Sequence, residues 1–481
     1  MLAQLKTGMH CNHTMNRNGA ATKHISPHSP ANKKTPPARH SLPSSSSNSS
    51  SSISNSRNSN NSLPGSSNSS QDEHRAFWQA LPDHEFYGPR LQHLYFYADV
   101  DDESVLKLRG EVLEACRSVR KDDGTWVNPK PIIIHVHSAG GSIASMQWLL
   151  SLFNQVHVPL CVCVDAKSAS AATALSIMAP YRVGTEHSLC LLHDYSAWQG
   201  GRREELLEKM RRAEMHRDTY KSLYIARTRM TDSEVEALLR RDKLLDAPTC
   251  LRLGVYDRVL RPDRKAAVRA YMSSSKMSKM PADNAPFFKT NWNRAFATCS
   301  ADKPDEFPRS FDALLASEDQ AKPVLYVTPG GSGECDDPTL SLAMIARIMS
   351  SPVPVIAIVD NIVTWWQMLP VLFCHRRFMY ENAMLDSKLA YQPSWGDRLA
   401  DIIHNAGIMR SLISNTVKSH ATPSTKLVNE MFDRMVTLTA EECLANGLVD
   451  VVVPLSARAR GGRGGKKNKA FQGKTAYGKS T

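Results

Sequence analysis

Three sequence landmarks occur twice along this 481-residue chain, in the same order and at nearly constant separations. They are a Val-Pro apolar run ending in Asp (residues 158–165 and 353–360), a Gly-Gly pair (140–141 and 330–331), and a Cys-Leu segment ending in Asp (250–257 and 443–450). The offsets of 195, 190 and 193 residues differ by at most five, which is improbable by chance. The repeat predicts two tandem copies of one fold.

Apolar runs alternate with segments of helical spacing within the first copy. We expect strands at residues 94–99, 131–136, 158–164 and 189–193, and helices at 105–120, 143–153 and 202–229. Strands that alternate with helices indicate a mostly parallel sheet with right-handed crossovers. The expected fold class is α/β, as two tandem domains that each contain such a sheet with helices.

Composition sets the boundaries of these domains. We expect a disordered Ser/Asn-rich leader (1–80), a first domain (84–262), a linker (263–290), a second domain (291–455) and a basic Arg/Gly/Lys tail (456–481). The leader is too polar to offset its ordering entropy by burial. Its basic, acid-free, Ser-rich composition also fits an organelle transit peptide, and both interpretations stay open.

The formal net charge of +12 lies mainly at the two ends. Residues 1–71 hold seven basic residues and residues 456–481 hold eight, with no acidic residue in either segment. Between them, 44 basic and 47 acidic residues nearly cancel. The composition therefore argues against a nucleic-acid-binding body, although a tail could contact RNA, a membrane or an acidic partner weakly.

The cysteine pattern and hydropathy exclude several further classes. The ten Cys residues form no Cys-x-x-Cys pair and no metal-like Cys/His spacing, so we expect a reducing compartment and no metal or other cofactor. No apolar run approaches the ~20 residues that span a bilayer. The N-terminus lacks the apolar core of a secretory signal. We expect the cytoplasm or an organelle matrix, mitochondrial or plastid, and not secretion.

A set of polar residues follows the expected strands of the first copy. The Gly-Gly turn leaves backbone N–H groups uncovered, and such donors suit a developing oxyanion. Ser170 lies in a small-residue turn, His193 ends a strand, and Asp242 follows a long helical excursion, so the three could form a Ser-His-Asp set. Alternatively, Ser170 is a helix N-cap. His187 could also take the role of His193, and Asp246 that of Asp242.

These motifs resemble those of the Clp protease proteolytic subunits, the ClpP family. Residues 138–142 resemble its Ser-Pro-Gly-Gly turn, 167–170 its Gln-Ala-Ala-Ser nucleophile turn, 191–193 its Met-Ile-His segment, 241–257 its Arg-Asp block, and 97–104 its early strand and turn. The resemblance covers about residues 90–262. It implies that Ser170 is the nucleophile, His193 the base and Asp242 the orienting acid, with the N–H groups of Gly141 and Ala171 as the oxyanion hole.

The resemblance also implies a function and partners. It implies an endopeptidase that hydrolyses polypeptides within a homo- or hetero-oligomeric ring, fed by a ClpX-like AAA+ unfoldase. That partner would consume the ATP, because this chain has no Gly-x4-Gly-Lys-Ser/Thr loop. Ala139 replaces the family's Pro and Ala171-Ala172 replace its Met-Gly, yet both oxyanion amides are retained. The region 202–229 corresponds to the family's ring-joining handle helix, or is a solvated amphipathic helix.

The second copy lacks the three residue types. The offsets put Trp365 at the position of Ser170, Lys388 at that of His193 and Met435 at that of Asp242. We therefore predict that this copy is inert, with Trp365 and Trp366 either filling the vacated pocket or reflecting drift. A Ser-Lys dyad that uses Lys388, as in tandem signal-peptide peptidases of the same fold, is disfavoured because a His/Asp set accompanies the Ser.

Three other functions remain alternatives. The chain could be an inactive structural subunit of a Clp-type complex, since half of it is already degenerate. It could be a crotonase-type acyl-CoA enzyme, although the first copy offers no well-placed Glu pair. The basic tail could bind RNA with the body as a scaffold.

Overall fold

The first sheet carries helices on both faces. A computed structural model describes residues 68–120, 122–153, 155–194, 201–261, 294–296, 306–316, 324–327, 339–351, 354–387 and 398–454. The first part comprises α1 (Asn68–Ala80), η1 (Asp83–Tyr87), β1 (Gln92–Phe96), α2 (Asp102–Ala115), β2 (Val119–Arg120), β3 (Trp126–Val127), β4 (Ile132–Ser138), α3 (Ile143–Phe153), β5 (Leu160–Ala169), α4 (Ala171–Met178), β6 (Tyr181–Thr185), β7 (Leu189–Leu191), α5 (Arg203–Arg227), α6 (Asp232–Leu239), β8 (Leu244–Asp246), α7 (Ala247–Leu253) and β9 (Arg258–Leu260).

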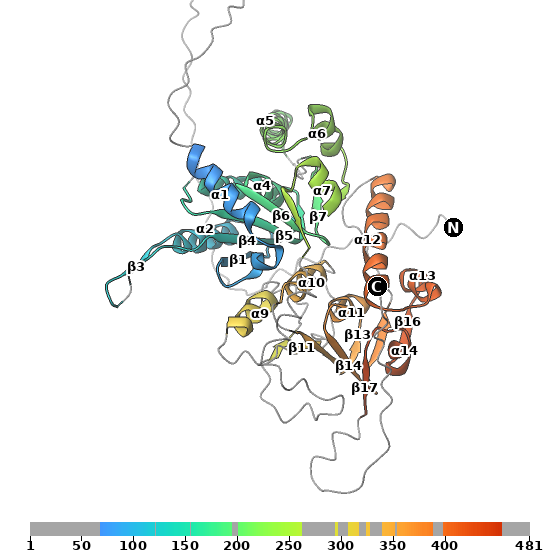
Figure 1. Cartoon of the computed structure of the whole chain (residues 1–481). Helices are drawn as coiled ribbons and strands as arrows, with labels where there is room; N and C mark the ends of the chain where they lie inside the picture. Colours follow the sequence, from blue (N-terminus) through green and yellow to red (C-terminus); the bar gives the residue numbers. More distant parts are fainter. Residues whose placement is uncertain are drawn as a thin grey trace, which may run out of the picture. The chain divides into compact units, whose positions relative to one another are not determined.

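The strands of this part run in the order β1-β4-β5-β6-β9, all parallel, and β7 joins β5 and then pairs antiparallel with β8. The expected α/β class is confirmed. Side chains alternate along β4, so Ile132 and Ile134 pack in the core that includes α2, α3 and α4, whereas Ile133 packs with α1 and η1 (Figure 1). Turns follow the C-terminal ends of β4 and β5 at one edge of the sheet.

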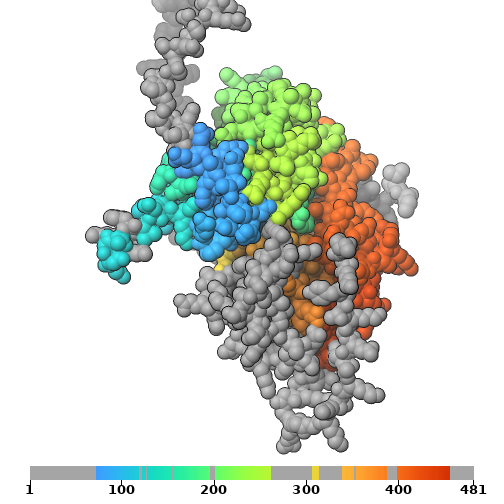
Figure 2. All heavy atoms as spheres, viewed as in Figure 1, coloured from blue at the N-terminus to red at the C-terminus, as the bar shows by residue number. Residues whose placement is uncertain are grey.

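The N-terminal boundary lies earlier than the sequence predicted. Residues 68–80 of the expected leader form α1, and its Trp78 is fully buried against Phe86. Arg75 bonds to Asp257 at 2.9 Å, and Figure 2 shows the blue N-terminal segment against the yellow-green end of this domain. The physical reason is that a buried Trp contributes enough apolar area to order a helix in which most other residues are polar. Residues 1–67 lie outside the described part.

Two expected elements differ in extent. Helix 105–120 is observed as α2, which ends at Ala115 before the short β2–β3 hairpin. The strand expected at 158–164 continues as β5 to Ala169, because it changes partner from β6 to β7 at Lys167. The expected small-residue turn at 167–172 is therefore confined to Ser170, between β5 and α4.

The second part has a similar strand order. Its elements are β10 (Arg294–Phe296), α9 (Glu306–Ala316), β11 (Val324–Val327), α10 (Leu340–Met349), β12 (Ile356–Val359), β13 (Ile362–Val363), α11 (Trp365–Leu372), β14 (Arg376–Tyr380), β15 (Met384–Ser387), α12 (Leu399–His420), α13 (Thr425–Asp433), β16 (Val436–Thr439), α14 (Ala440–Ala445) and β17 (Val451–Val453). The parallel order is β10-β11-β12-β14-β17, and β15 pairs antiparallel with β16 as β7 does with β8.

One ion pair recurs at equivalent places in the two sheets. Arg182 of β6 pairs with Asp257 at 3.0 Å, and Arg377 of β14 pairs with Asp450 at 2.6 Å. In both cases the Asp also accepts the backbone N–H of the Arg. The shared strand order and this shared Arg–Asp ion pair support the duplication, which stays a prediction. The linker, the tail and the Gly330-Gly331 turn lie outside the described residues.

Apolar residues of both parts belong to one core. Leu189, Leu191 and Leu244 of the first part cluster with residues of α10, α11 and α12. The described residues of both sheets fall within one compact unit, Pro64–Thr481. The edge formed by β7 and β8 is therefore backed by the second part.

Candidate active site

Ser170 has a strained backbone. Its φ of 53° and ψ of −125° make it the single non-glycine residue with positive φ among the described residues. Such a conformation costs about 1–3 kcal/mol and persists only where the surroundings impose it. Here the Ser170 N–H donates to Leu191 O at 2.9 Å, and Thr173 N–H donates to Ser170 O at 3.0 Å. The Ser170 side chain makes no N-cap hydrogen bond, so capping of α4 does not explain this residue.

The glycine turn packs directly against Ser170. Gly140 and Gly141 have φ values of 99° and 143°. A Cβ on Gly140 would lie 2.6 Å from both Ala169 O and Ser170 Cβ, so only glycine allows this approach. Gly141 forms a parallel bridge with Val100, in which Gly140 O and Ser142 N make the bonds. The N–H of Gly141 takes no part in these two bonds.

His193 and Asp242 form a hydrogen-bonded pair. His193 Nδ1 lies 2.8 Å from Asp242 Oδ1, and both side chains are partly buried. A carboxylate only accepts, so the proton is on Nδ1 and Nε2 is free to accept a proton. Nε2 is buried and has no hydrogen-bond partner among the described residues. This is the tautomer that a general base in a Ser-His-Asp set requires.

One pocket joins these groups. Its lining includes Ser170, Ala171, Gly141 and His193, and Asp242 bonds to the outer side of the imidazole. Ser170 and His193 line the same pocket, and His193 Nε2 makes no hydrogen bond with the Ser170 hydroxyl. Catalytic hydrogen bonds are often long before substrate binds, so this geometry is compatible with a nucleophile and base.

The competing residues lie elsewhere or have other partners. His187 packs edge-on against Phe373, outside the pocket lining, and burial lowers its pKa to about 4. Asp246 caps α7 by accepting the N–H of Thr249 at 3.0 Å. Both are occupied by structural contacts.

The sequence did not indicate the other residues that line the pocket. They are Ile143, Asp194, Arg217, Tyr220, Tyr224 and Leu239. Arg217 of α5 is bound to Asp194 at 2.8 Å and to Glu236 at 2.5 Å, so its charge is balanced. For helix α5 the sequence indicates only an assembly helix or a solvated helix. No pattern in it marks which residues line the pocket with Ser170.

The expected counterparts in the second part occupy different environments. Trp365 is fully buried and Trp366 is 6% exposed, both in the core at the start of α11. Met435 is 60% exposed. Thr364, directly before α11, has ordinary φ and forms a regular capping box with Gln367, in contrast to the strained Ser170. Lys388 lies outside the described residues.

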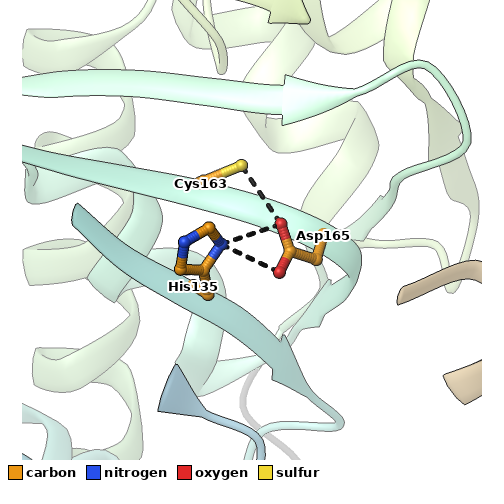
Figure 3. Close-up of side chains that lie close together, drawn as sticks. All are labelled: His135, Cys163 and Asp165. Carbon is orange, nitrogen blue, oxygen red and sulfur yellow. Dashed lines mark hydrogen bonds and ion pairs between the residues drawn. The ribbon is translucent and has the colours of Figure 1, made fainter. Parts of the chain in front are cut away.

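A second polar cluster lies buried on the neighbouring strands β4 and β5. His135 Nδ1 bonds to Asp165 at 2.9 Å, and Cys163 Sγ lies 3.2 Å from the same carboxylate (Figure 3). The hydroxyls of Tyr87 and Tyr97 also donate to Asp165, at 3.1 and 2.5 Å. These ligand types and distances would suit a metal ion.

The polar atoms of this cluster are engaged in hydrogen bonds with one another and with neighbouring residues. Burial lowers the pKa of His93 to about 3, so this imidazole is neutral. Its Nε2 donates to Gly88 O, and its Nδ1 must therefore accept from His135 Nε2, each at 3.0 Å. His135 Nδ1 lies 2.9 Å from Asp165, and the Cys163 thiol, whose pKa burial raises, donates to the same carboxylate at 3.2 Å. Together with the two tyrosine hydroxyls, these contacts engage the Asp165 carboxylate within the cluster.

One protein-family model matches the part of the chain that carries this pocket. Residues 126–263 match the family model of the Clp protease. The Clp protease match includes Ser170, His193 and Asp242 and stops before the second part. No curated protein sequence matches the chain. Among the helices of the described residues, none is long and apolar enough to cross a membrane.

Proposed function

We propose that this protein is a ClpP-like serine endopeptidase that hydrolyses unfolded polypeptides. The observation that carries the proposal is the single pocket lined by Ser170 and His193, with Asp242 bonded to the far nitrogen of the imidazole. The Clp protease match over the same residues supports the reaction class. Ser170 acts as nucleophile, His193 as general base and Asp242 as the group that fixes the imidazole.

The proposed mechanism assigns a proton path. As Ser170 Oγ attacks the scissile carbonyl, His193 Nε2 accepts its proton, and the Asp242 carboxylate stabilises the imidazolium. The oxyanion accepts hydrogen bonds from the N–H groups of Gly141 and Ala171. His193 then protonates the leaving amine, and a water molecule repeats the sequence on the acyl-enzyme.

The strain at Ser170 has a use in this mechanism. The positive φ turns the residue out of the strand so that it begins α4 with its hydroxyl uncommitted to capping. Gly140 contacts that turn, which keeps the Gly141 amide beside the reacting atoms. We propose that the strain cost is retained because it preorganises the nucleophile and the oxyanion donors.

Partners follow from the family match and belong to the same proposal. A ring of copies or of related subunits would enclose the pocket, and a ClpX-like AAA+ unfoldase would deliver extended chain. The second part would take no chemical step, since Trp365 and Met435 cannot replace Ser170 and Asp242.

A second candidate is a non-catalytic subunit of a Clp-type complex. The unmade hydrogen bond between the Ser170 hydroxyl and His193 Nε2, and the lack of a Ser-His-Asp set in half of the chain, favour it. In that case the chain would associate with catalytic partners and hydrolyse nothing itself.

Peptide hydrolysis by matched variants separates the two candidates. The full chain is assayed with an unfolded, fluorescently labelled polypeptide, alone and with a AAA+ unfoldase and ATP. Ser170→Ala should reduce kcat by up to ~10⁶-fold and Asp242→Asn by ~10⁴-fold. Asp246→Asn, a change at the neighbouring structural Asp, should retain turnover. Hydrolysis that survives in Ser170→Ala, or no hydrolysis by the wild type under either condition, refutes the proposal.

A further inference from the structure

A helix of the second part holds the segment that carries Asp242. Helix α12 begins at Leu399, and its residues Asp401 and Asn405 lie one helical turn apart on the same face. Both are fully buried, although polar residues of this kind are usually exposed. Their partners are the residues around Asp242, more than 150 positions earlier in the chain.

Asn405 completes the open edge of β8. This strand pairs with β7 on one side only. On the other side, Asn405 Nδ2 donates to Asp242 O at 2.7 Å, and Leu244 N–H donates to Asn405 Oδ1 at 2.8 Å. One side-chain amide therefore bonds the main chain at two residues spaced by two, as a neighbouring strand would. His404 adds a donor to Leu244 O at 3.1 Å.

Asp401 holds the residue before Asp242. Its Oδ1 accepts from both Arg241 Nε at 2.8 Å and Arg241 Nη2 at 2.6 Å, and its Oδ2 lies 3.1 Å from Arg241 Nε. It also lies 3.4 Å from the N–H of Asp242. The main chain on both sides of Asp242 is thus fixed by α12, while the Asp242 side chain remains directed to His193.

From these contacts we infer that the second part of the chain is a positioning domain, in which Asp401 and Asn405 set the place of Asp242 and through it the orientation of His193. The inference rests on the proposed function for its catalytic consequence. It gives the second part, which takes no chemical step itself, a supporting role in each turnover. Asp401 and Asn405 are positioning residues, because the hydrogen bonds described above join them to Arg241, Asp242 and Leu244, none of which lines the pocket.

The test uses the full-length chain with Asn405→Ala and Asp401→Asn, compared with Arg410→Ala. Arg410 lies on the same helix but pairs with exposed Asp433 at 3.2 Å, away from β8. The first readout is the downfield NMR signal of the His193 Nδ1 proton in protein with ¹⁵N-labelled histidine, assigned by its loss in His193→Gln. The second is the rate of Ser170 labelling by a fluorophosphonate.

We expect Arg410→Ala to match the wild type in both readouts. Asn405→Ala should lose or broaden the His193 proton signal and slow labelling by about 10- to 100-fold, since a misplacement of about 1 Å costs that much. Asp401→Asn, which preserves side-chain size, should change both readouts in the same direction and serves if Asn405→Ala does not fold. In peptide hydrolysis the loss should appear in kcat with KM unchanged.

Each outcome decides the inference separately from the proposed function. An unchanged proton signal in folded Asn405→Ala and Asp401→Asn overturns the inference. A signal lost in these variants but kept in Arg410→Ala supports it, even if the wild type takes no fluorophosphonate and the proposed function fails.

Discussion

Substitution of Gly141 by alanine tests the geometry of the oxyanion donors. A Cβ at this position would lie 2.4 Å from Val100 O, and Cβ atoms do not approach backbone oxygen closer than 3.0 Å. Val100 or the turn must therefore move by at least about 0.6 Å in a close-packed interior. The two 2.7 Å bonds that join Val100 to Gly140 O and Ser142 N would lengthen with it. The φ of 143° adds strain for any L-residue with a side chain.

These effects give expected magnitudes. Strain of this kind lowers the free energy of unfolding by about 1–3 kcal/mol. Displacement of one oxyanion donor slows the acylation step by ~10²–10³-fold. The matched control is Gly110→Ala in α2, where an added Cβ meets nothing within 4 Å. This control should leave acylation unchanged and raise the free energy of unfolding by up to ~1 kcal/mol, because alanine is the better helix former.

The assay measures fluorophosphonate acylation of Ser170 by intact mass over time, with urea unfolding of the same samples. Gly141→Ala should lose both acylation rate and stability, whereas Gly110→Ala should lose neither. If Gly141→Ala reacts within twofold of the wild type at unchanged stability, the Gly141 amide is not an oxyanion donor and the turn geometry described above is not required.

Three further predictions address other parts of the molecule. A triple variant of the second part should restore no peptidase turnover to a Ser170→Ala background. The substitutions are Trp365→Ser, Lys388→His and Met435→Asp, and they should fail because Trp365 is buried and Met435 is 60% exposed. Recovered turnover would show that the second pocket is intact. Burial lowers the pKa of His93 from 6.5 to about 3, so between these pH values the unfolded chain binds a proton that the folded chain does not. The free energy of unfolding should therefore decrease as pH falls below 6.5, by at most ~1.4 kcal/mol per pH unit. Urea titrations should show a shallower decrease in His93→Gln, and equal slopes would exclude this residue as the cause. Tyr220 has a buried hydroxyl with no hydrogen-bond partner among the described residues, so Tyr220→Phe should raise the free energy of unfolding by about 1 kcal/mol, and a clear loss of stability would reveal a bond to this hydroxyl.

Local patterns predicted much of the first part of the chain. The Ile-Ile-Ile run at 132–134 and the charged stretch after residue 202 gave a strand and a helix that are observed as β4 and α5. The candidate triad was predicted from residue types at strand ends, because parallel strands bring such ends to one edge of a sheet. The structure brings Ser170 and His193 to one pocket and bonds His193 to Asp242.

Other features depend on contacts that no local pattern records. Helix α1 was missed because its order comes from Trp78 packing against residues distant in the sequence, while most of the other residues in the segment are polar. Asn405 lies 163 positions from Asp242, and nothing in its own segment marks it as a strand substitute. The His135 cluster was hidden because a histidine within an apolar strand looks like core until Asp165 is found opposite it.

The most direct measurement for the account as a whole is the site of covalent modification of the purified full-length chain by a fluorophosphonate. Tryptic mass spectrometry should find one adduct, on Ser170, with none in His193→Ala and none in the second part of the chain. An adduct on a different serine, or labelling at Ser170 that is indifferent to loss of the His193 imidazole, would contradict the Ser-His-Asp assignment.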